Sequence, residues 1–593
     1  MIIDNILGLS KINVDSKDYM NTEHPIVFVR DFLTTQNIGK NILIKYYVSD
    51  YNNSDWIKNE YNSTFTVEIE INGRTYKKTT YAGESSIVID GINTEGEYIY
   101  SIRAIDQNGI SSPTQFFKIL ITDETITESD IYIMRDSDLS TYSITTGNIT
   151  DVETAKQNKT GLTNLFSAIK NDGYKQITLK NATYMVDYHG DNIVFPSDFT
   201  IDLNGSTIKV LACTDLNGGQ VALMKNCKNT HIINGNIYGN ADVFNADATK
   251  ANTKYNVPGE WLSVIDMQSC SYCSYEDINV KYPVGYNLDF GMASDKGVSD
   301  GYLTFEDNTY IDTNGEAKTT AKSIATSDFK EMVKTKQYDL FKVARYLGYS
   351  GFSGNNPVIY VHFYDDKKTY IKTVKSRQYL DIKNVTNAKY IRVTAFGTAE
   401  SLKNQLVLHG LGSTYNCYVK NCSFSNSRTC LFHPTICNNI AIENCTFENV
   451  CTEILKYPVT TMVADFEDGW LNCQNVFARN NSLKKDDVSI VMAITGWNFN
   501  FEKNNGFSYT IRDGIFGLNI NGNMAKSFDL SISDVKYKQN FILVKNSCFT
   551  DSMVYRYSGS ANMAEKIERV AYKALTSTSQ NVTVIKNKSA IIN

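Results

Sequence analysis

Acidic side chains are most concentrated at 465–470, where the chain reads Asp-Phe-Glu-Asp-Gly-Trp. In a strand, Asp465 and Glu467 share one face and Asp468 points to the other. Hydrolysis of a glycosidic bond needs one protonated carboxyl group to assist the leaving oxygen and one ionised carboxylate as base or nucleophile. These three carboxyl groups are therefore candidates for acid and base, and Trp470 is suited to stack on a sugar ring.

The same stretch has a second interpretation. Acidic residues on a solvent-facing surface need no role, and the Asp-Gly pair at 468–469 is of a kind that often forms only a turn. The residues alone leave both interpretations open, because a catalytic pair requires two carboxyl groups that converge on one bond.

Further residues are candidates for contact with an anion or a carbohydrate. Arg428 and His433 are suited to an anionic group, although the proline after His433 is equally consistent with a hydrogen-bonded turn. Tyr360 and Tyr364 fall on one face of a predicted strand, where they either meet a ligand or pack in a core. Trp497 is a further candidate platform for a sugar.

The elements that must position these side chains are predicted from a near-repeat at 415–452. Matching residues lie 23 positions apart (444 − 421 = 23), namely Asn421 with Asn444, Cys422 with Cys445, and Phe424 with Phe447. Alternating apolar residues around them indicate strands with one buried face, and the period is too short for a helix pair. A solenoid of parallel strands meets both conditions.

In such a solenoid, equivalent residues of successive coils stack. A buried asparagine in a turn then shares amide hydrogen bonds with the asparagines of the neighbouring coils, which satisfies polar groups that would be costly to bury alone. Glu443 precedes Asp465 by 22 residues (465 − 443 = 22), so this interpretation places Glu443 one coil below the acidic group.

Composition excludes several classes of partner. The net charge of −6 gives no basic footprint, so nucleic acid is not an expected partner. No apolar run is long enough to span a bilayer, and the N-terminal residues lack the basic start and apolar core of a secretory signal. We therefore expect no membrane partner and no export through the usual signal.

The 12 cysteines raise the question of disulfides or metal. Only 6 histidines accompany them, spread widely, and Cys270-Ser-Tyr-Cys273 is the only Cys-x-x-Cys pair. Without a second pair this is a weak signal for zinc or redox chemistry. The prediction is therefore buried free thiols in a reduced compartment, with no metal site.

The N-terminal part shows a different pattern. Residues 1–22 are predicted to be an attachment segment, and 23–123 contain short alternating strands at the spacing of a small sandwich. The run from Glu97 to Pro113 resembles the last two strands of a fibronectin type III domain. In that family a tyrosine near the start of the penultimate strand makes a corner hydrogen bond, and Tyr98 occupies that position.

Residues 124–158 are predicted to be a connector, followed by a helix at 160–171 with one apolar face. Units of strand, Asn-Gly and strand follow at 199–208 and 231–237. This order resembles the opening of the pectate-lyase-like β-helices of bacteriophage tail spikes, in which a short helix covers the open end of the solenoid. A cap is required because the first coil would otherwise expose its interior and its strand edge.

The predicted fold class is all-β. A right-handed parallel β-helix occupies 159–293 and 405–550, with an N-terminal immunoglobulin-like sandwich and an inserted jelly-roll-like β-sandwich at 294–404. The insertion resembles the carbohydrate-binding-like jelly rolls of phage adhesins. The last residues, 551–593, are predicted to be a C-terminal cap or a trimer-forming end, and they include a helical pattern at 562–573.

The resemblance to tail spikes also implies a function. Members of that family are usually homotrimers that bind or degrade a surface polysaccharide of the bacterial host, and their glycosidases use carboxylate pairs on the solenoid surface. It implies a virion protein of a phage tail or baseplate, made in the host cytoplasm. Its N-terminal region would join other tail or baseplate proteins, and its solenoid would meet a capsule or a teichoic-acid-like wall polymer.

Two hypotheses follow. The chain is either an adhesin that holds the polymer without turnover, or a depolymerase that uses the carboxylates at 465–468. Pectate-type lyase chemistry needs a calcium-binding set of aspartates and a basic catalytic residue. These are not found at matching positions, so the sequence predicts no cofactor and argues against a lyase.

Overall fold

The structure is a computed structural model of the 593-residue chain. It describes residues 25–50, 64–123, 125–211, 219–242, 262–285, 287–288, 290–291, 297–312, 314–321, 323–345, 358–404, 406–411, 413–427, 431–450, 464–466, 473–484, 490–493, 496–511, 515–532, 541–557, 564–568, 571–572 and 575–577. The described chain is mostly β, with few helices, so the coarse prediction of a β protein is confirmed. None of its helices has the length and apolar character that crossing a membrane requires.

Two antiparallel sheets form the N-terminal sandwich. One contains β1 (Pro25–Val29), β3 (Ile42–Asp50) and β6 (Gly83–Ile89), and the other contains β2 (Thr35–Gln36), β4 (Thr64–Ile71), β5 (Arg74–Tyr81), β7 (Gly96–Asp106) and β8 (Gln115–Ile121), with β2 parallel to β8. Alternate residues of both sheets share one apolar core. The Tyr98 hydroxyl donates a hydrogen bond of 3.1 Å to the carbonyl of Thr94, so the expected corner hydrogen bond is present.

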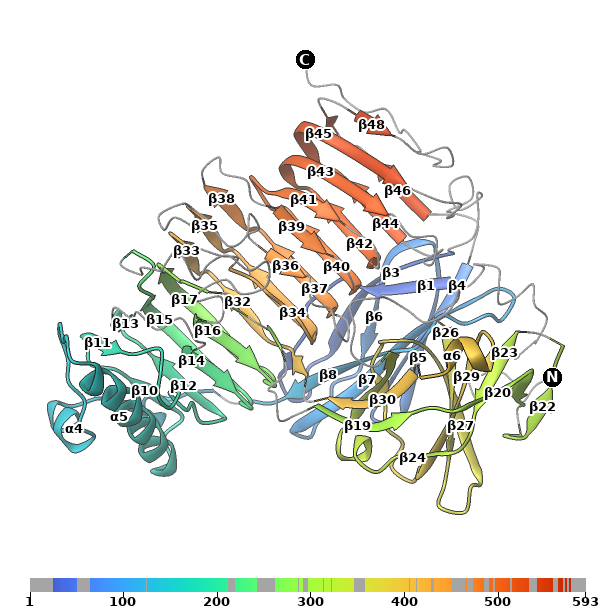
Figure 1. Cartoon of the computed structure of the whole chain (residues 1–593), viewed down its shortest axis with the longest axis horizontal. Coiled ribbons are helices and arrows are strands. Elements are labelled where there is room, and N and C mark those ends of the chain that lie inside the picture. The colour runs from blue at the N-terminus through green and yellow to red at the C-terminus, as the bar shows by residue number, and fades with distance from the viewer. Residues whose placement is uncertain are drawn as a thin grey trace.

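A stack of coils forms the body of the molecule (Figure 1). Each strand of its longest row pairs in parallel with the next: β9 (Ile131–Ile133), β10 (Gln176–Thr178), β12 (Phe199–Asp202), β15 (Thr230–Tyr238), β17 (Ser274–Lys281), β32 (Tyr418–Lys420), β34 (Cys437–Glu443), β37 (Cys473–Arg479), β40 (Gly496–Glu502), β42 (Ile515–Asn521), β44 (Phe541–Lys545) and β46 (Ala564–Glu568). Because the register is kept, apolar residues stack inside, from Ile201 and Ile232 to Ile520 and Val544.

Shorter parallel rows complete the coils. One contains β11 (Thr183–Val186), β13 (Thr207–Val210), β33 (Ser423–Ser425), β35 (Thr446–Glu448) and β38 (Ser482–Lys484), with β31 (Thr414–Tyr415) paired to β34. A second row contains β14 (Gly219–Lys225), β16 (Leu262–Gln268) and β18 (Phe290–Gly291). A third row contains β36 (Ala464–Phe466), β39 (Ile490–Ala493), β41 (Ser508–Ile511), β43 (Met524–Ile532), β45 (Cys548–Tyr557), β47 (Ala571–Tyr572) and β48 (Leu575–Ser577).

Stacked polar groups in the turns hold the coils in register. The expected ladder at Asn421 and Asn444 exists, with Nδ2 of Asn444 3.3 Å from Oδ1 of Asn421, but it is exposed. The buried ladder lies one residue further along, where Asn481, Asn504 and Asn523 succeed Cys422 and Cys445. In this ladder each side-chain oxygen accepts a backbone N–H of the coil before, at 2.8–3.0 Å.

The cysteines belong to the same dry interior. All nine cysteines in the described ranges are free thiols; eight are buried and Cys548 is partly buried, which confirms the prediction of buried thiols for those eight. Burial raises the pKa of Cys445, so its thiol stays protonated. These cysteines therefore act as small apolar residues between coils.

The first coil is covered by helix α5 (Val152–Asn171), whose N-cap Asp151 accepts a hydrogen bond of 2.8 Å from the backbone of Thr154. The segment 124–158, predicted to be a connector, also contains η1 (Glu128–Asp130), β9 and α4 (Asp136–Thr141). These elements are too short to show a period in the sequence, and β9 is fixed by its parallel pairing with β10. In Figure 1, α4 and α5 lie at one end of the stack and β45 and β48 lie at the other.

The inserted sandwich contains two larger antiparallel sheets and a two-stranded sheet of β21 and β22. Its elements are β19 (Gly297–Tyr302), β20 (Phe305–Asp307), β21 (Thr309–Ile311), β22 (Ala317–Thr319), β23 (Ile324–Ser327), β24 (Lys330–Glu331), η2 (Thr335–Gln337), β25 (Leu340–Arg345), β26 (Val358–Tyr364), β27 (Tyr370–Arg377), β28 (Ile382–Lys383), β29 (Tyr390–Phe396), α6 (Ala399–Leu402) and β30 (Leu406–Leu411). β30 pairs antiparallel with β19 and β25, so residues 406–411 belong to the insertion. The prediction that the solenoid resumes at 405 is therefore wrong for these residues.

The prediction of helix from the pattern at 562–573 is wrong. Residues 564–568 form β46 and 571–572 form β47, both parallel to the preceding coil. Ile567 is in register with Val544 of the preceding coil, so the pairing of the coils decides the conformation over the local helical spacing.

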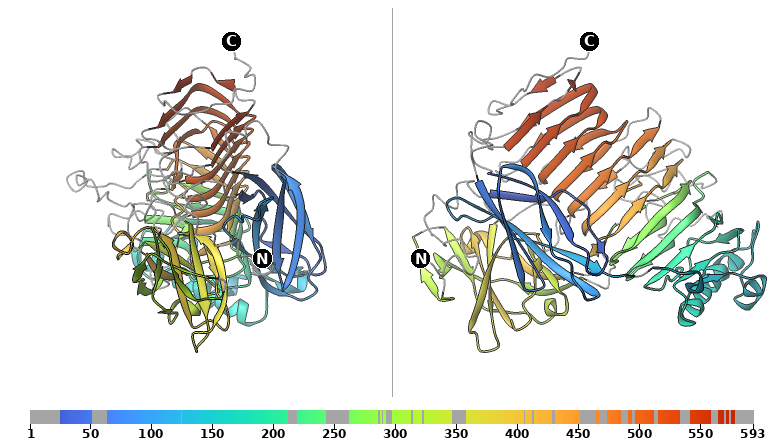
Figure 2. Two further views of the ribbon diagram at one scale, coloured as in Figure 1. Left: turned by 90° about the vertical axis from the view of Figure 1, so that its right-hand side faces the viewer. Right: turned by 180° about the vertical axis from the view of Figure 1, so that it is seen from behind.

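Both sandwiches are packed against the solenoid and against each other (Figures 1 and 2). The Trp497 ring lies 5.3 Å from Phe28 and its N–H donates to Gln115 at 2.9 Å. Asp381 of the insertion accepts hydrogen bonds from Tyr415 at 3.2 Å and Asn438 at 2.7 Å. These buried contacts fix three bodies in one arrangement.

We expect the buried asparagine ladder to carry much of the stability of the solenoid. Replacing Asn504 by leucine keeps the branched shape of the side chain but leaves the Asn481 N–H and the Ala478 carbonyl without these partners, so unfolding should become easier by about 3 kcal/mol. Asn444→Gly is the control, because it keeps the left-handed backbone at φ 57° and loses only an exposed hydrogen bond. Equal shifts of the thermal unfolding midpoint in the two variants would contradict this account.

Candidate functional site

The predicted carboxylates are only partly described. Asp465 lies in β36, in register with Met492 of the next coil. Glu467, Asp468, Trp470 and also Arg428 lie outside the described residues. A catalytic role for the acidic group therefore stays a prediction.

Glu443 does not lie one coil below Asp465. It belongs to β34, in register with Lys420 on one side and Arg479 on the other, and Arg479 is 3.7 Å from its carboxylate. The expectation assumed a constant period, but the coil after Glu443 is longer, since 479 − 443 = 36. Asp465 falls in that longer coil, on the separate row that runs from β36 to β39.

The two predicted tyrosines of the insertion lie inside it. Tyr360 packs with Ile324 and Val358. Tyr364 is 1% exposed and its hydroxyl donates to the carbonyl of Gly315 at 3.0 Å. Burial raises the pKa of Tyr364 to about 12. Their positions match the core-packing alternative, and the ligand-binding role has no support in the geometry.

His433 and Trp497 are also buried. His433 is 2% exposed, and burial lowers its pKa to about 4, so the imidazole is neutral at pH 7 and carries no charge for an anion. Trp497 is 2% exposed and lies at the contact between the solenoid and the N-terminal sandwich. Neither residue offers a surface for a ligand in this arrangement.

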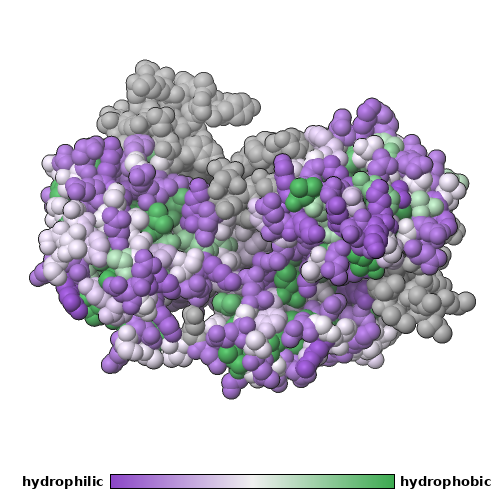
Figure 3. Space-filling model, turned by 90° about the horizontal axis from the view of Figure 1, so that it is seen from below, coloured by the Kyte–Doolittle hydropathy of each residue, from purple (hydrophilic) through white to green (hydrophobic). Residues whose placement is uncertain are grey.

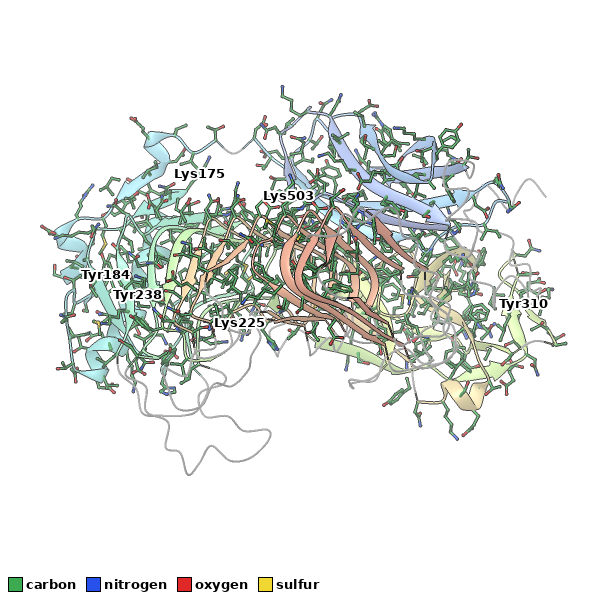
Figure 4. All side chains as sticks on the ribbon, turned by 90° about the horizontal axis from the view of Figure 1, so that it is seen from above. Lys175, Tyr184, Lys225, Tyr238, Tyr310 and Lys503 are labelled. Atoms are coloured by element: carbon green, nitrogen blue, oxygen red, sulfur yellow. The ribbon has the colours of Figure 1, made fainter. Side chains whose placement is uncertain are left out.

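A groove of about 540 Å³ lies between the first coils and the N-terminal sandwich. One side is formed by residues between 34 and 37 and between 122 and 126, and the coils contribute Thr200, His231 and Tyr418. Lys175 also lines the groove. In Figure 4 it lies on the flank of the solenoid nearest the N-terminal sandwich, and Lys225 lies on the opposite flank.

The register of the coils aligns three polar side chains beside this groove, and two more are hydrogen-bonded to them. His231 pairs with Ser274, and Ser274 pairs with Tyr418 of the coil after the insertion. His231 Nδ1 lies 2.7 Å from Ser274 Oγ, and His231 Nε2 lies 3.2 Å from Asn229 Oδ1. The hydroxyls of Ser274 and Tyr418 both donate to Glu276 Oε1, each at 2.8 Å.

The Glu276 carboxylate makes Ser274 a poor candidate for a nucleophile. In a Ser-His-acid triad, histidine accepts the serine proton. Here the Glu276 carboxylate competes with His231 for that proton, since it lies 2.8 Å from Ser274 Oγ and only accepts hydrogen bonds. The array is therefore suited to hold side chains in place for binding and not to acyl transfer.

The groove is polar and keeps its donors. Burial raises the pKa of Tyr418, and the nearby Glu276 carboxylate raises it further, so the phenol stays protonated and donates. Asp123, Asp198 and Lys175 add charged groups to the lining. Charged and neutral hydrogen-bond donors and acceptors next to the Tyr418 ring are suited to a ligand with many hydroxyl groups.

The sequence interpretation did not select this array. Ser274 follows His231 by 43 residues (274 − 231 = 43), and Tyr418 follows Ser274 by 144 (418 − 274 = 144), because the insertion lies between them. Aligning the strand units 231–237 and 275–282 would have brought His231 and Ser274 together. The wall from the N-terminal sandwich leaves no signal in the sequence.

Within the described part of the chain, no group of three or more His, Cys, Asp or Glu side chains is arranged to hold a metal ion. The groove offers hydrogen bonds, charge and the aromatic side chains of Phe199, Tyr272 and Tyr418.

The chain was compared with known proteins. No protein-family model and no curated protein matches it. Among solved structures it is similar to the fibronectin(III)-like modules of Clostridium thermocellum CbhA, at 15% identity and a TM-score of 0.14, over 18% of this chain and 52% of that one. The chain thus spans about half the length of those modules.

Two longer structures are also similar. The Family 28 exopolygalacturonase of Yersinia enterocolitica has 10% identity and a TM-score of 0.26, over 94% of this chain and 88% of that one. The surface protein and adhesin PfbA of Streptococcus pneumoniae has 9% identity and a TM-score of 0.29, over 76% of this chain and 99% of that one. At these values the likenesses do not establish a shared overall fold or function.

The burial of His433 predicts a pH dependence. The unfolded chain takes up a proton near pH 6.5 and the folded chain only near pH 4, so stability is full above pH 6.5 and falls as the pH drops toward 4. The loss is about 3 kcal/mol. His433→Gln should remove this part of the acid sensitivity in unfolding midpoints measured from pH 7 to pH 4. Identical pH profiles for the variant and the wild type would show that His433 titrates normally.

Proposed function

We propose that this chain is a phage tail or baseplate protein that recognises a surface glycopolymer of its bacterial host. The observation that carries the proposal is the groove between the first coils and the N-terminal sandwich. It offers aligned hydroxyl, amide, imidazole and carboxylate groups beside a tyrosine ring. Such groups hold a hydroxylated ligand by hydrogen bonds and ring contact.

The solenoid in this proposal is a right-handed parallel β-helix of the tail-spike kind. Its support is the parallel pairing of successive coils and the helix α5 at the first coil, in the place that the sequence resemblance assigns to a cap. A stack of this kind presents one row of side chains per strand position, which suits a polymer whose units also repeat.

The polymer class is a capsule or a teichoic-acid-like wall polymer. On the face shown in Figure 3, hydrophilic residues cover most of the described surface and apolar ones are scattered. Large exposed apolar side chains, such as Leu43 at 44% in the N-terminal sandwich and Val333 at 62% in the insertion, come from different parts of the chain. A hydrated polymer fits such a surface better than an apolar partner.

The remaining parts of the proposal concern assembly. We place the protein in the virion, made in the host cytoplasm and assembled as a homotrimer as tail spikes usually are. Its N-terminal region, including residues 1–22, would meet other tail or baseplate proteins. The face of the N-terminal sandwich around Phe28 is already covered by Trp497, so that contact would use another face.

We expect binding of purified host wall polymer to depend on the groove. His231→Ala and Tyr418→Phe should each weaken binding about tenfold, the effect of losing one well-placed hydrogen bond. Lys225→Ala, on the opposite flank of the solenoid in Figure 4, is the control. Biolayer interferometry on immobilised polymer would measure the three affinities. Wild-type affinity in both groove variants would refute the assignment of the site.

Turnover separates the adhesin from the depolymerase. Because we propose an adhesin that holds the polymer without turnover, we expect no release of short fragments when the protein is incubated with wall polymer or capsule. Fragments that disappear in the double variant Asp465→Asn, Glu467→Gln would instead establish a depolymerase at the acidic group. The double variant should bind cells as the wild type does if the adhesin hypothesis is right.

A further inference from the structure

A second cavity, also of about 540 Å³, lies where the two sandwiches meet. The N-terminal sandwich lines it with residues of β4 and β7 and the turn at Asn72, and the insertion lines it with β27, β28 and residues 384–386. It is separate from the groove at the first coils, with which it shares no lining residue.

Two lysines of the insertion line this cavity without a partner. Among the residues that the structure describes, neither Lys372 nor Lys383 makes a hydrogen bond or a close ion pair. Burial lowers the pKa of Lys372, and the neighbouring Lys383 lowers it further, while the Glu70 carboxylate acts in the opposite direction. Lys372 is half-buried and Lys383 is exposed, and two neighbouring ammonium groups that lack a close carboxylate are stabilised by an anion between them.

The acidic residues of the cavity are mostly compensated. Lys118 lies 3.0 Å from Glu97 and 3.2 Å from Asp339, and Lys228 lies 3.8 Å from Glu97, so two lysines offset the two carboxylates. Only Glu70, which is exposed, faces Lys372 without such a partner. Carboxylates beside a cationic pair favour a ligand that carries hydroxyl groups as well as negative charge, because carboxylates accept hydrogen bonds from hydroxyls.

The cavity is formed before any ligand enters. Backbone N–H of Thr114 in the N-terminal sandwich donates to the carbonyl of Lys375 in the insertion at 3.1 Å, and Nζ of Lys375 donates to the carbonyl of Ser111. Phe116, Leu340 and Tyr415 pack together beside these bonds. A ligand therefore meets fixed walls and does not have to order them.

We propose that this cavity is a second binding site, which takes a hydroxylated anion such as a polyol phosphate or an acidic sugar between Lys372 and Lys383. The site is independent of the groove, and its ligand need not be part of the polymer held there. The phosphate or carboxylate group contacts the two ammonium groups, and the hydroxyls reach Glu70 and the side chain of Ser101.

The test is a titration of the full-length chain with small probes. Glycerol 1-phosphate and glucuronate represent the two sources of negative charge, and glycerol is the neutral control. We expect saturable binding of at least one anion, weakened tenfold or more in Lys372→Gln, Lys383→Gln, and little binding of glycerol. Preference for one anion identifies phosphate or carboxylate as the natural group.

Matched variants keep the test specific. Lys367→Gln, Lys403→Gln removes the same charge from exposed positions of the insertion outside the cavity lining and should bind as the wild type does. Lys372→Arg retains a cation and should retain binding, which separates loss of charge from loss of fold. Absence of saturable binding for both anions, or equal weakening in the two double variants, would overturn the proposal. Because the probes are not the wall polymer, failure here leaves the groove assignment standing.

Discussion

The register of the coils is the constraint on which the rest of this structure depends. A parallel stack places equivalent residues one above another, so each turn must present a group that its neighbours tolerate. Asn439 donates to Asn416 at 2.6 Å and Asn498 donates to Asn475 at 2.8 Å, which locks successive coils together. A shift by one residue would break every such bond and turn the apolar row outward.

The same asparagines fasten the N-terminal sandwich. Asn416 donates to the carbonyl of Lys118 at 2.9 Å, Asn439 to that of Leu33 at 3.0 Å, and Asn498 to that of Val29 at 2.8 Å. Arg30 is buried between them and donates to Asn500 at 2.6 Å; burial lowers its pKa to about 10, so it remains charged at pH 7. These asparagines are separate from the ladder of Asn481, Asn504 and Asn523, and they both link successive coils and position the wall of the groove.

The sequence revealed the parts of this design that repeat locally. The period of 23 residues, the apolar alternation and the Tyr98 corner are local signals, and the structure contains each of them. We expected a buried asparagine ladder at Asn421 and Asn444, but these residues occupy an exposed position of the turn. Their backbone is left-handed, with φ of 55° and 57°. Cys422 and Cys445 hold the buried place there, and asparagine takes it only from Asn481 onward.

The candidate site could not be predicted from local sequence signals. The groove combines a wall from the N-terminal sandwich with coils on both sides of an insertion of more than 100 residues (411 − 297 = 114), and the second cavity combines the two sandwiches. Glu443 illustrates the same limit, since its neighbour across the coils is Arg479 and the variable coil length hid this pairing. Side chains that face each other through tertiary packing leave no spacing for the sequence to reveal.

The central claim is that the groove beside His231 and Tyr418 holds the host glycopolymer. A crystal structure of the full-length chain with an oligosaccharide cut from host wall polymer would test it most directly. The account predicts sugar density between the first coils and residues 34–37 and 122–126, within hydrogen-bond distance of the groove side chains. Sugar density at 465–470, with only solvent in the groove, would contradict the account and favour the acidic group as the site.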